Sequence, residues 1–280
     1  MNFDLNDFLQ RAFAEDVGDG DYSSLACIPA TAIGKARLLV KDTGILAGVE
    51  LARQIFAYAD EQLIFTPLLQ DGAAVKFGDI AFIVEGSKQS ILKTERLVLN
   101  LMQRMSGIAT TTHRYVEAIQ GTNAKLLDTR KTTPTLRYFE KWAVRIGGGY
   151  NHRFGLYDMI MLKDNHIDFA GGIRQAIEKS NAFLQENKLH IPIEIEVRNL
   201  SELQEVLACG KVQRIMLDNF TPEKICEVLP LIQRRYETEA SGGITIDNIR
   251  AYAETGVDFI SVGALTHSVK SLDLSLKAFN

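Results

Sequence analysis

The sequence of 280 residues has no long hydrophobic run and few cysteines. No window approaches the roughly 20 apolar residues that cross a membrane as a helix. The first residues, MNFDLNDFLQRAFAEDVGDGD, are acidic and lack the apolar core of a signal or transit peptide. The three cysteines are scattered without CxxC spacing, which argues against a disulfide framework and against a cysteine metal site. We therefore expect a cytoplasmic protein with free thiols.

The chain also lacks a net positive charge. Its 31 lysines and arginines face 35 aspartates and glutamates, which gives a net charge of -4 at pH 7. A nucleic acid or an anionic membrane is therefore not expected as the main partner. No Ser-His-Asp arrangement and no Walker loop is recognisable either. The content of 46% hydrophobic and 24% charged residues is typical of a globular protein with one large or two moderate domains.

Against this acidic background, the stretch from Leu127 to His166 is rich in positive charge. Its acidic residues are only Asp128, Glu140, Asp158 and Asp164. Its cationic residues are Arg130, Lys131, Arg137, Lys141, Arg145, Arg153 and Lys163, with His152 and His166 beside them. A guanidinium group can bind both oxygens of a carboxylate or phosphate at once. We interpret this stretch as part of a pocket for a small polyanion.

The second half of the chain alternates short apolar runs with segments of helical periodicity. The runs are AKLLD, YDMIMLKD, IPIEIEV, RIMLD, TEASG and VDFISVG. Strands that are apolar on both faces and separated by helices form a parallel sheet covered by helices. Six strands fall short of the eight of a full barrel. We therefore predict an α/β protein with a boundary near residue 110, in which residues 111–280 form an atypical barrel with fewer than eight strands.

The predicted strands end in polar residues, which parallel strands bring together at one edge of the sheet. Glu196 and Asp218 end consecutive strands, and two carboxylates in one pocket suit Mg²⁺ or a developing positive charge on a sugar. Alternatively, each carboxylate pairs with a neighbouring lysine or arginine. Glu194 faces the same side as Glu196, because strand side chains alternate with a period of two. The pattern alone does not choose between these two glutamates.

Two glycine motifs close the last two strand–helix turns, SGGI at residues 241–244 and SVGAL at residues 261–265. Barrel enzymes often bind phosphate there with backbone N–H groups. Short glycine motifs also serve packing, but the placement of both favours a phosphate cradle. Several cations, two carboxylates and such a cradle fit transfer at a phosphorylated sugar better than hydrolysis or redox chemistry. Arg96 is expected in the first turn of a helix over residues 94–120, where the helix dipole disfavours a cation.

The motifs DTRKTTP, GGGYNHRFGLYDMIMLKDNHI, IEIEV, MLDNF, EASGGI and VDFISVGALTHS resemble, in this order, the quinolinate phosphoribosyltransferase family. The resemblance extends upstream through TERLVLNLMQRMSGIAT to EDVGDGD and covers essentially the whole chain. It implies that quinolinate and phosphoribosyl pyrophosphate react, with Mg²⁺, to nicotinate mononucleotide, pyrophosphate and CO2 in NAD biosynthesis. It also implies an N-terminal α/β sandwich and dimerisation domain over residues 1–110, onto which a C-terminal helix at residues 266–280 packs. The implied assembly is a homodimer, with a hexamer of three dimers as the larger alternative.

Position by position, the resemblance implies a role for each candidate site residue. Lys163, Glu196 and Asp218 would be catalytic, and Glu196 and Asp218 would hold Mg²⁺ directly or through water or substrate. The quinolinate carboxylates would be held by Arg130, His152, Arg153 and Lys163, joined by Arg96 from the partner subunit. Lys131 would face the pyrophosphate. The 5′-phosphate would lie against Ser241, Gly242, Gly243, Gly263 and Ala264, with His267 nearby.

Three other functions are compatible with this reasoning. One is a paralogous enzyme of the same fold, such as the type found in molybdate-transport operons, and another is an enzyme that acts on nicotinate. The number of cations favours a dicarboxylate over the monocarboxylate nicotinate. The third is a non-catalytic sensor of pyridines or nucleotides. A sensor would be expected to lose Glu196, Asp218 or Lys163, and all three are present.

Overall fold

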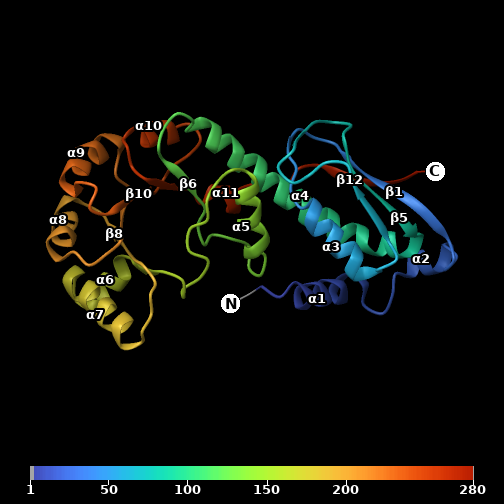
Figure 1. The fold of residues 1–280 in the computed structure, drawn as a ribbon, viewed down its shortest axis with the longest axis horizontal. Coiled ribbons are helices and arrows are strands. Elements are labelled where there is room, and N and C mark those ends of the chain that lie inside the picture. The colour runs from blue at the N-terminus through green and yellow to red at the C-terminus, as the bar shows by residue number, and fades with distance from the viewer. Residues whose placement is uncertain (1–2, 280) are drawn as a thin grey trace. The chain divides into compact units, whose positions relative to one another are not determined.

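The structure, a computed structural model, describes residues 3–279, which contain a four-stranded antiparallel sheet and a six-stranded parallel sheet (Figure 1). Each sheet belongs to its own compact unit. Unit 1 comprises residues 1–113, 133–148 and 269–280, and unit 2 comprises residues 114–132 and 149–268. Unit 1 thus contains two segments that follow residue 110 in the sequence. The two-domain α/β architecture predicted from the sequence is confirmed.

The antiparallel sheet of unit 1 has the strand order β12-β1-β5-β3. Its strands are β1 (Ile33–Val40), β3 (Ile64–Pro67), β5 (Ile80–Ser87) and β12 (Leu274–Phe279). In the second half of β1, the buried residues Ala36, Leu38 and Val40 alternate with more exposed ones. This alternation places the apolar side chains on one face of the sheet. A separate pair of short strands is formed by β2 (Gly44–Ile45) and β4 (Ala74–Val75).

The helices of unit 1 begin at recognisable caps. Asp4 caps α1 (Leu5–Val17) by accepting a hydrogen bond from the Asp7 amide, and Asp21 caps α2 (Tyr22–Cys27) in the same way. The other helices are α3 (Val49–Ala59), α4 (Lys88–Ala118), whose last turn belongs to unit 2, and α5 (Arg137–Ile146). On α5, Glu140 is buried and accepts hydrogen bonds from Arg104 of α4. This pair explains why α5 belongs to unit 1.

Two expectations for these elements are wrong. Helix α4 begins at Lys88, so Arg96 does not lie in its first turn. The helix expected over residues 266–280 is replaced by the short helix α11 (Ala264–His267) and the strand β12. Strand β12 pairs antiparallel with β1, for example Leu276 with Leu38. The buried residues Leu272, Leu274 and Leu276 alternate with polar ones, which is the period of a strand and not of a helix.

The parallel sheet of unit 2 has the strand order β6-β11-β10-β9-β8-β7, and every neighbouring pair is parallel. Its strands are β6 (Lys125–Leu127), β7 (Ile160–Leu162), β8 (Ile193–Val197), β9 (Arg214–Asp218), β10 (Glu237–Ser241) and β11 (Phe259–Ser261). All five residues of β8 are buried, as expected for a strand covered on both faces. Six parallel strands confirm the predicted α/β class with fewer than eight strands.

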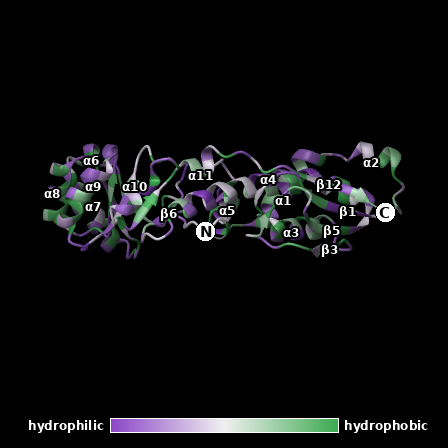
Figure 2. Ribbon diagram, turned by 90° about the horizontal axis from the view of Figure 1, so that it is seen from above, coloured by the Kyte–Doolittle hydropathy of each residue, from purple (hydrophilic) through white to green (hydrophobic). Residues whose placement is uncertain are grey.

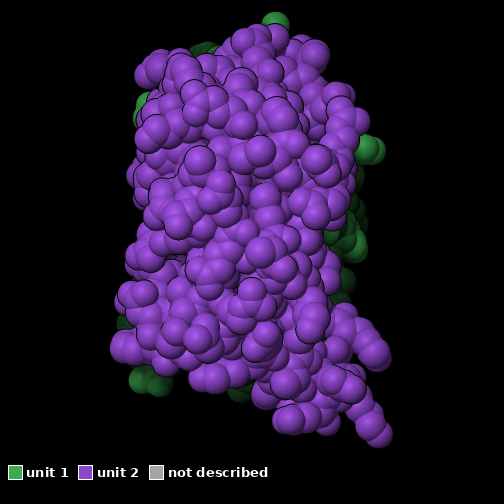
Figure 3. Space-filling view, turned by 90° about the vertical axis from the view of Figure 1, so that its left-hand side faces the viewer, with its two compact units in different colours: residues 1–113, 133–148, 269–280 green, residues 114–132, 149–268 purple. Residues whose placement is uncertain are grey.

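The helices of unit 2 connect these strands and lie outside them. They are α6 (Asp164–Ala170), α7 (Ile173–Glu186), α8 (Leu200–Cys209), α9 (Pro222–Ile232) and α10 (Ile249–Glu254). Figure 1 shows α7, α8 and α9 on the outer side of β8 and β10. The same helices carry both hydrophobic and hydrophilic residues in Figure 2, because each has one buried face. The surface of unit 2 is drawn in Figure 3. No helix within residues 3–279 is long and apolar enough to cross a membrane.

Candidate active site

A cavity of about 580 Å³ lies at the carboxyl ends of the parallel strands in unit 2. It is lined by residues that end or follow β6, β7, β9, β10 and β11, and by the loop before β7. The predicted site residues in its lining are Arg130, Lys131, His152, Arg153, Lys163, Asp218, Ser241, Gly242, Gly243, Gly263, Ala264 and His267. Residues distant in the sequence thus meet at one edge of the sheet, as parallel strands require.

A larger cavity of about 1170 Å³ lies at the opposite, amino-terminal ends of the same strands. Gln213, Glu237 and Asp258, which precede or begin β9, β10 and β11, contribute to its lining. None of the predicted site residues lines it. In parallel α/β sheets, ligands bind at the carboxyl ends of the strands. The smaller cavity is therefore the candidate active site, despite its size.

The cations of the candidate site are not fully neutralised by the protein. Burial lowers the pKa of Arg153, and the nearby positive charge of Arg130 lowers it further. The Arg153 guanidinium donates one hydrogen bond, of 3.3 Å, to the carbonyl oxygen of Met159. Two guanidinium groups that repel each other in a partly buried cavity favour the binding of an anion. This electrostatic relation supports the prediction of a polyanion pocket.

The two predicted catalytic carboxylates have different partners. Glu196 is buried at the end of β8 and lies 2.7 Å from the Nζ atom of Lys163. Asp218, at the end of β9, accepts hydrogen bonds from the Ser241 hydroxyl at 2.7 Å and from the Asn219 amide at 2.6 Å. No lysine or arginine among the described residues forms an ion pair with Asp218. The alternative that each carboxylate pairs with a lysine or arginine is therefore correct for Glu196 and wrong for Asp218.

The cavity wall contains Gly242 and Gly263 because neighbouring side chains leave no room for a Cβ atom at these positions. Gly242 has φ +90°, and a Cβ atom there would lie 2.2 Å from the Asn219 side-chain oxygen. A Cβ atom on Gly263 would lie 3.0 Å from the Lys131 side chain and 3.1 Å from the His267 ring. The Thr266 hydroxyl donates to the Lys131 carbonyl oxygen at 2.8 Å, which ties the loop after β6 to α11. Backbone therefore forms this side of the cavity.

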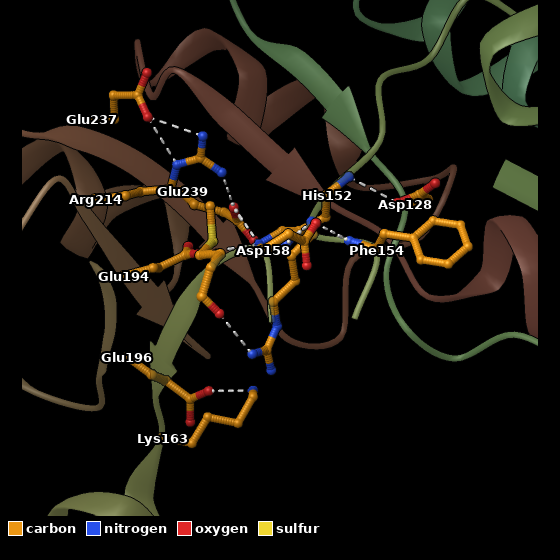
Figure 4. Close-up of polar contacts among 12 residues, drawn as sticks. Asp128, His152, Phe154, Asp158, Lys163, Glu194, Glu196, Arg214, Glu237 and Glu239 are labelled. Carbon is orange, nitrogen blue, oxygen red and sulfur yellow. Dashed lines mark hydrogen bonds and ion pairs between the residues drawn. The ribbon is translucent and has the colours of Figure 1, made fainter. Parts of the chain in front are cut away.

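A buried network of charged residues adjoins the cations (Figure 4). We define the internal charge network as Glu194, Glu239, Arg214 and His152. The His152 Nε2 atom lies 3.0 Å from Glu194 and 3.3 Å from Glu239, and both glutamates are fully buried. Arg214 lies 3.2 Å from Glu239 and 2.9 Å from the exposed Glu237. Glu194 thus belongs to this network, whereas Glu196 contacts Lys163.

His152 and Glu194 bind protons more tightly in this network than they would in water. Burial opposes a charge on His152, but hydrogen bonds to Glu194 and Glu239 outweigh it and raise its pKa to about 9. Burial, with the charge of Glu239, raises the pKa of Glu194 to about 7. Burial also disfavours ionised Glu239, but its contacts with His152 and other donors lower its pKa. The Arg153 backbone N–H donates a hydrogen bond to His152 Nδ1 at 2.6 Å, so Nδ1 carries no proton. The ring proton lies on Nε2, and a further proton taken up by the network lies on the carboxylate side.

The sequence pattern contains one signal for this network. Side chains two residues apart in a strand share a face, and the predicted Ser241 therefore points to the same side as Glu239. The predicted Asp218 likewise shares its face with Arg214. The observed register places Arg214 beside both Glu194 and Glu237 on the neighbouring strands. The order of the strands, which the sequence does not give, was needed to bring these residues together.

Arg96 is the remaining predicted site residue. It is exposed on α4 of unit 1 and does not line the cavity of its own chain. Its entry into the site of a partner subunit stays a prediction. Glu196 also does not line the cavity, but it joins the site through Lys163.

Comparisons with known proteins agree with the fold. The C-terminal domain of quinolinate phosphoribosyl transferases matches residues 108–277, and the N-terminal domain matches residues 21–106. The chain is 45% identical to quinolinate phosphoribosyltransferase (decarboxylating) 1b of Nicotiana tabacum, over 98% of this chain and 82% of the relative. It is 42% identical to a probable nicotinate-nucleotide pyrophosphorylase (carboxylating) of Bacillus subtilis, over 97% of this chain and 92% of the relative. The crystal structure of NadC from Streptococcus pyogenes matches with a TM-score of 0.92 and 41% identity over 100% of both chains. The chain therefore belongs to the quinolinate phosphoribosyltransferase family.

Proposed function

We propose that the protein is a quinolinate phosphoribosyltransferase of NAD biosynthesis. It transfers the phosphoribosyl group of phosphoribosyl pyrophosphate to quinolinate and forms nicotinate mononucleotide, pyrophosphate and CO2. The observation that carries this proposal is a single cavity that is lined by the cations Arg130, Arg153 and Lys163 and in which two glycine turns form a backbone wall. The names of relatives that are 42–45% identical over nearly the whole chain support the same reaction.

The cationic part of the cavity suits the two carboxylates of quinolinate. Arg130, Arg153 and Lys163 bring three positive charges, of which the Lys163 charge is partly balanced by Glu196. Placing several cations in one cavity is unfavourable until an anion fills it. A dianion relieves more of this repulsion than the monocarboxylate nicotinate. The charge count therefore favours quinolinate as the substrate.

The glycine turns suit the phosphate groups of the second substrate. Ser241 offers a hydroxyl group, and Gly242, Gly243, Gly263 and Ala264 leave the backbone open to an approaching phosphate. His267 and Lys131 lie against Gly263 at the same wall. We assign the 5′-phosphate to the glycine turns and the pyrophosphate to the Lys131 side.

The reaction needs groups that stabilise charge and does not need a covalent enzyme intermediate. When the bond between the ribose carbon and pyrophosphate breaks, the sugar becomes positively charged, and the carboxylates of Asp218 and Glu196 stabilise that charge. The pyridine nitrogen then donates its electron pair to the same carbon. The positive charge on the ring nitrogen allows the adjacent carboxylate to leave as CO2. The electron pair left on the ring carbon takes up a proton.

Mg²⁺ is part of this proposal. Glu196 and Asp218 would hold it, together with water and substrate oxygens, because Mg²⁺ prefers oxygen ligands and keeps several waters. Asp218 fits this ion, since it has no cationic partner among the described residues and ends the strand next to that of Glu196. Glu196 is paired with Lys163, so it would share its carboxylate between the lysine and the ion. When bound, the ion would neutralise the leaving pyrophosphate.

We further infer a cytoplasmic homodimer in which Arg96 of each subunit enters the partner's cavity, with a hexamer of three dimers as the larger alternative. The exposure of Arg96 supports this assignment. The free state of Cys27, Cys209 and Cys226 fits a reducing compartment.

Product analysis tests the proposed reaction. The purified protein is given phosphoribosyl pyrophosphate, Mg²⁺ and either quinolinate or nicotinate. We expect nicotinate mononucleotide and CO2 with quinolinate alone. Turnover of nicotinate would assign the protein to the salvage reaction. No product with either substrate from a folded protein would favour a paralogous enzyme or a sensor.

A further inference from the structure

Both ring nitrogens of His152 have partners inside the protein. Nδ1 accepts the backbone N–H of Arg153 at 2.6 Å, and Nε2 faces the carboxylates of Glu194 and Glu239. The backbone N–H of His152 donates to Asp128 at 2.8 Å. A carboxylate of the substrate could bond to a ring nitrogen only by displacing one of these partners. The ring is therefore placed to hold Arg153 rather than to bind the substrate itself.

Glu239 is held from its other side by Arg214. The Arg214 guanidinium lies 3.2 Å from Glu239 and stacks 4.0 Å from the centre of the Phe259 ring. The Arg214 side chain is only 12% exposed, and Glu239 is fully buried. One carboxylate oxygen of Glu239 thus faces a guanidinium and an imidazole at once, as Figure 4 shows. A carboxylate fixed from two sides holds the ring in one orientation.

Stability alone does not account for such a network. Apolar side chains of the same volume often stabilise a core as well as a buried ion pair does. The network does, however, determine the direction of the His152 ring, and through Nδ1 it determines the backbone position of Arg153. The next residues of this loop are also fixed, because Asp158 accepts hydrogen bonds from the amides of Phe154 and Gly155.

We propose that Glu239, held by Arg214, is a positioning residue that fixes the His152 ring and thereby aims Arg153 at the anionic aromatic substrate. The inference rests on the proposed function, in which Arg153 binds a quinolinate carboxylate. It adds that His152 acts through Arg153 and that Glu239 and Arg214 affect the affinity for the aromatic substrate through the orientation of the His152 ring.

Steady-state kinetics of a graded set of variants test the proposal. Glu239→Gln keeps an oxygen that can accept from both Arg214 and His152, so we expect a KM for quinolinate within about threefold of wild type. Glu239→Met removes the acceptor, and a displacement of Arg153 by a fraction of an ångström should raise this KM about tenfold or more. The KM for phosphoribosyl pyrophosphate should change less than about twofold, because its cradle is formed by the turns after β10 and β11 and not by the loop that carries Arg153.

A double variant distinguishes a loss of positioning from a loss of stability. Glu239→Met leaves Arg214 partly unpaired, so Arg214→Met is combined with it to remove both charges together. We expect this double variant to unfold near the wild-type temperature and to keep the raised KM for quinolinate. Glu237→Met is the matched control, because it removes the exposed partner of Arg214 and leaves Glu239 in place. An unchanged KM for quinolinate in Glu239→Met, or an equal rise in both KM values, would refute the positioning role.

A measurement without turnover separates this proposal from the proposed function. Long-range 1H–15N spectra report the protonation of both nitrogens of each of the five histidines, and His152→Gln assigns the relevant signals. In the wild type we expect His152 to carry its proton on Nε2, and in the double variant we expect these signals to shift or to average. Identical His152 signals in both proteins would overturn the proposal. Lack of product from quinolinate in the wild type would refute only the proposed function, since the spectra still decide whether the network fixes His152.

Discussion

Lys163 and Glu196 form an ion pair between the carboxyl ends of β7 and β8, with 2.7 Å between Nζ and the carboxylate. The Lys163 side chain is 43% exposed and the Glu196 side chain is 10% exposed. The lysine thus remains accessible to a ligand in the cavity while the carboxylate holds it in place. Such a half-exposed pair adds little to stability, because solvent screens it. Its role lies in the orientation of the lysine.

Replacing this lysine should therefore affect catalysis and not folding. For Lys163→Ala we expect turnover of quinolinate to fall by at least about 100-fold, because a cation aimed at the reacting molecule is lost. The free energy of unfolding should change by less than about 1 kcal/mol. Lys224→Ala, at an exposed site on α9, is the matched control and should behave as wild type. A folded Lys163→Ala protein with normal turnover would exclude a catalytic role.

Arg130 offers a test of the dicarboxylate assignment. Arg130→Ala removes one of two guanidinium groups that repel each other, so we expect the KM for quinolinate to rise about 100-fold while the fold is kept. Arg130→Lys restores the charge but not the paired N–H donors, and should recover only part of the loss. The KM values for both substrates are compared by steady-state kinetics. Full recovery by lysine would show that only charge is required.

The sequence predicts the architecture well where one local pattern decides it. The apolar run IPIEIEV contains the fully buried strand β8, and the run RIMLD is the strand β9. The helix expected over residues 266–280 is wrong, because most of this segment is the strand β12. The alternation of Leu272, Leu274 and Leu276 already indicated a strand, and its pairing with β1 shows why that strand is stable.

The candidate site could be predicted where residues end strands, and not where they pair across the sheet. Asp218 and Ser241 follow directly from the rule that parallel strands gather their carboxyl ends. The surroundings of His152 depend on β8, β9 and β10 lying side by side, and no local pattern gives this order. Sequence reasoning therefore placed His152 in the cavity but did not find the carboxylates that hold it.

Gly242 gives a test of the phosphate cradle. A side chain there is opposed both by φ +90° and by the Asn219 oxygen, 2.2 Å from the position of a Cβ atom. For Gly242→Ala we expect a loss of about 1–3 kcal/mol in the free energy of unfolding and a higher KM for phosphoribosyl pyrophosphate. Gly243→Ala is the matched control, because it has φ +63° but no atom within 4 Å of its Cβ position. If both variants lose the same stability and raise the KM equally, backbone strain and not the close approach to Asn219 causes the effects.

The internal charge network should make stability depend on pH. Contact with Glu194 and Glu239 raises the pKa of His152 from its ordinary 6.5 to about 9, so the cluster of His152 and these carboxylates binds its proton more tightly in the folded state. This contribution is fully present below pH 6.5 and is lost as the pH rises through about 9. The raised pKa of Glu194, about 7, acts in the same direction at lower pH. We expect the free energy of unfolding in urea to fall by about 1–3 kcal/mol between pH 6.5 and pH 9.5.

Histidine variants separate this effect from the titration of other groups. His152→Gln removes the ring whose pKa is raised. The fall in the free energy of unfolding between pH 6.5 and pH 9.5 should therefore be smaller in this variant than in the wild type. His190→Gln, at an exposed position of the same unit, should keep the wild-type dependence. If the free energy of unfolding depends on pH in the same way in wild type and His152→Gln, the proton is not held more tightly by Glu194 and Glu239 in the folded state. Since the same two carboxylates orient the ring, that result would also weaken the case for a fixed His152.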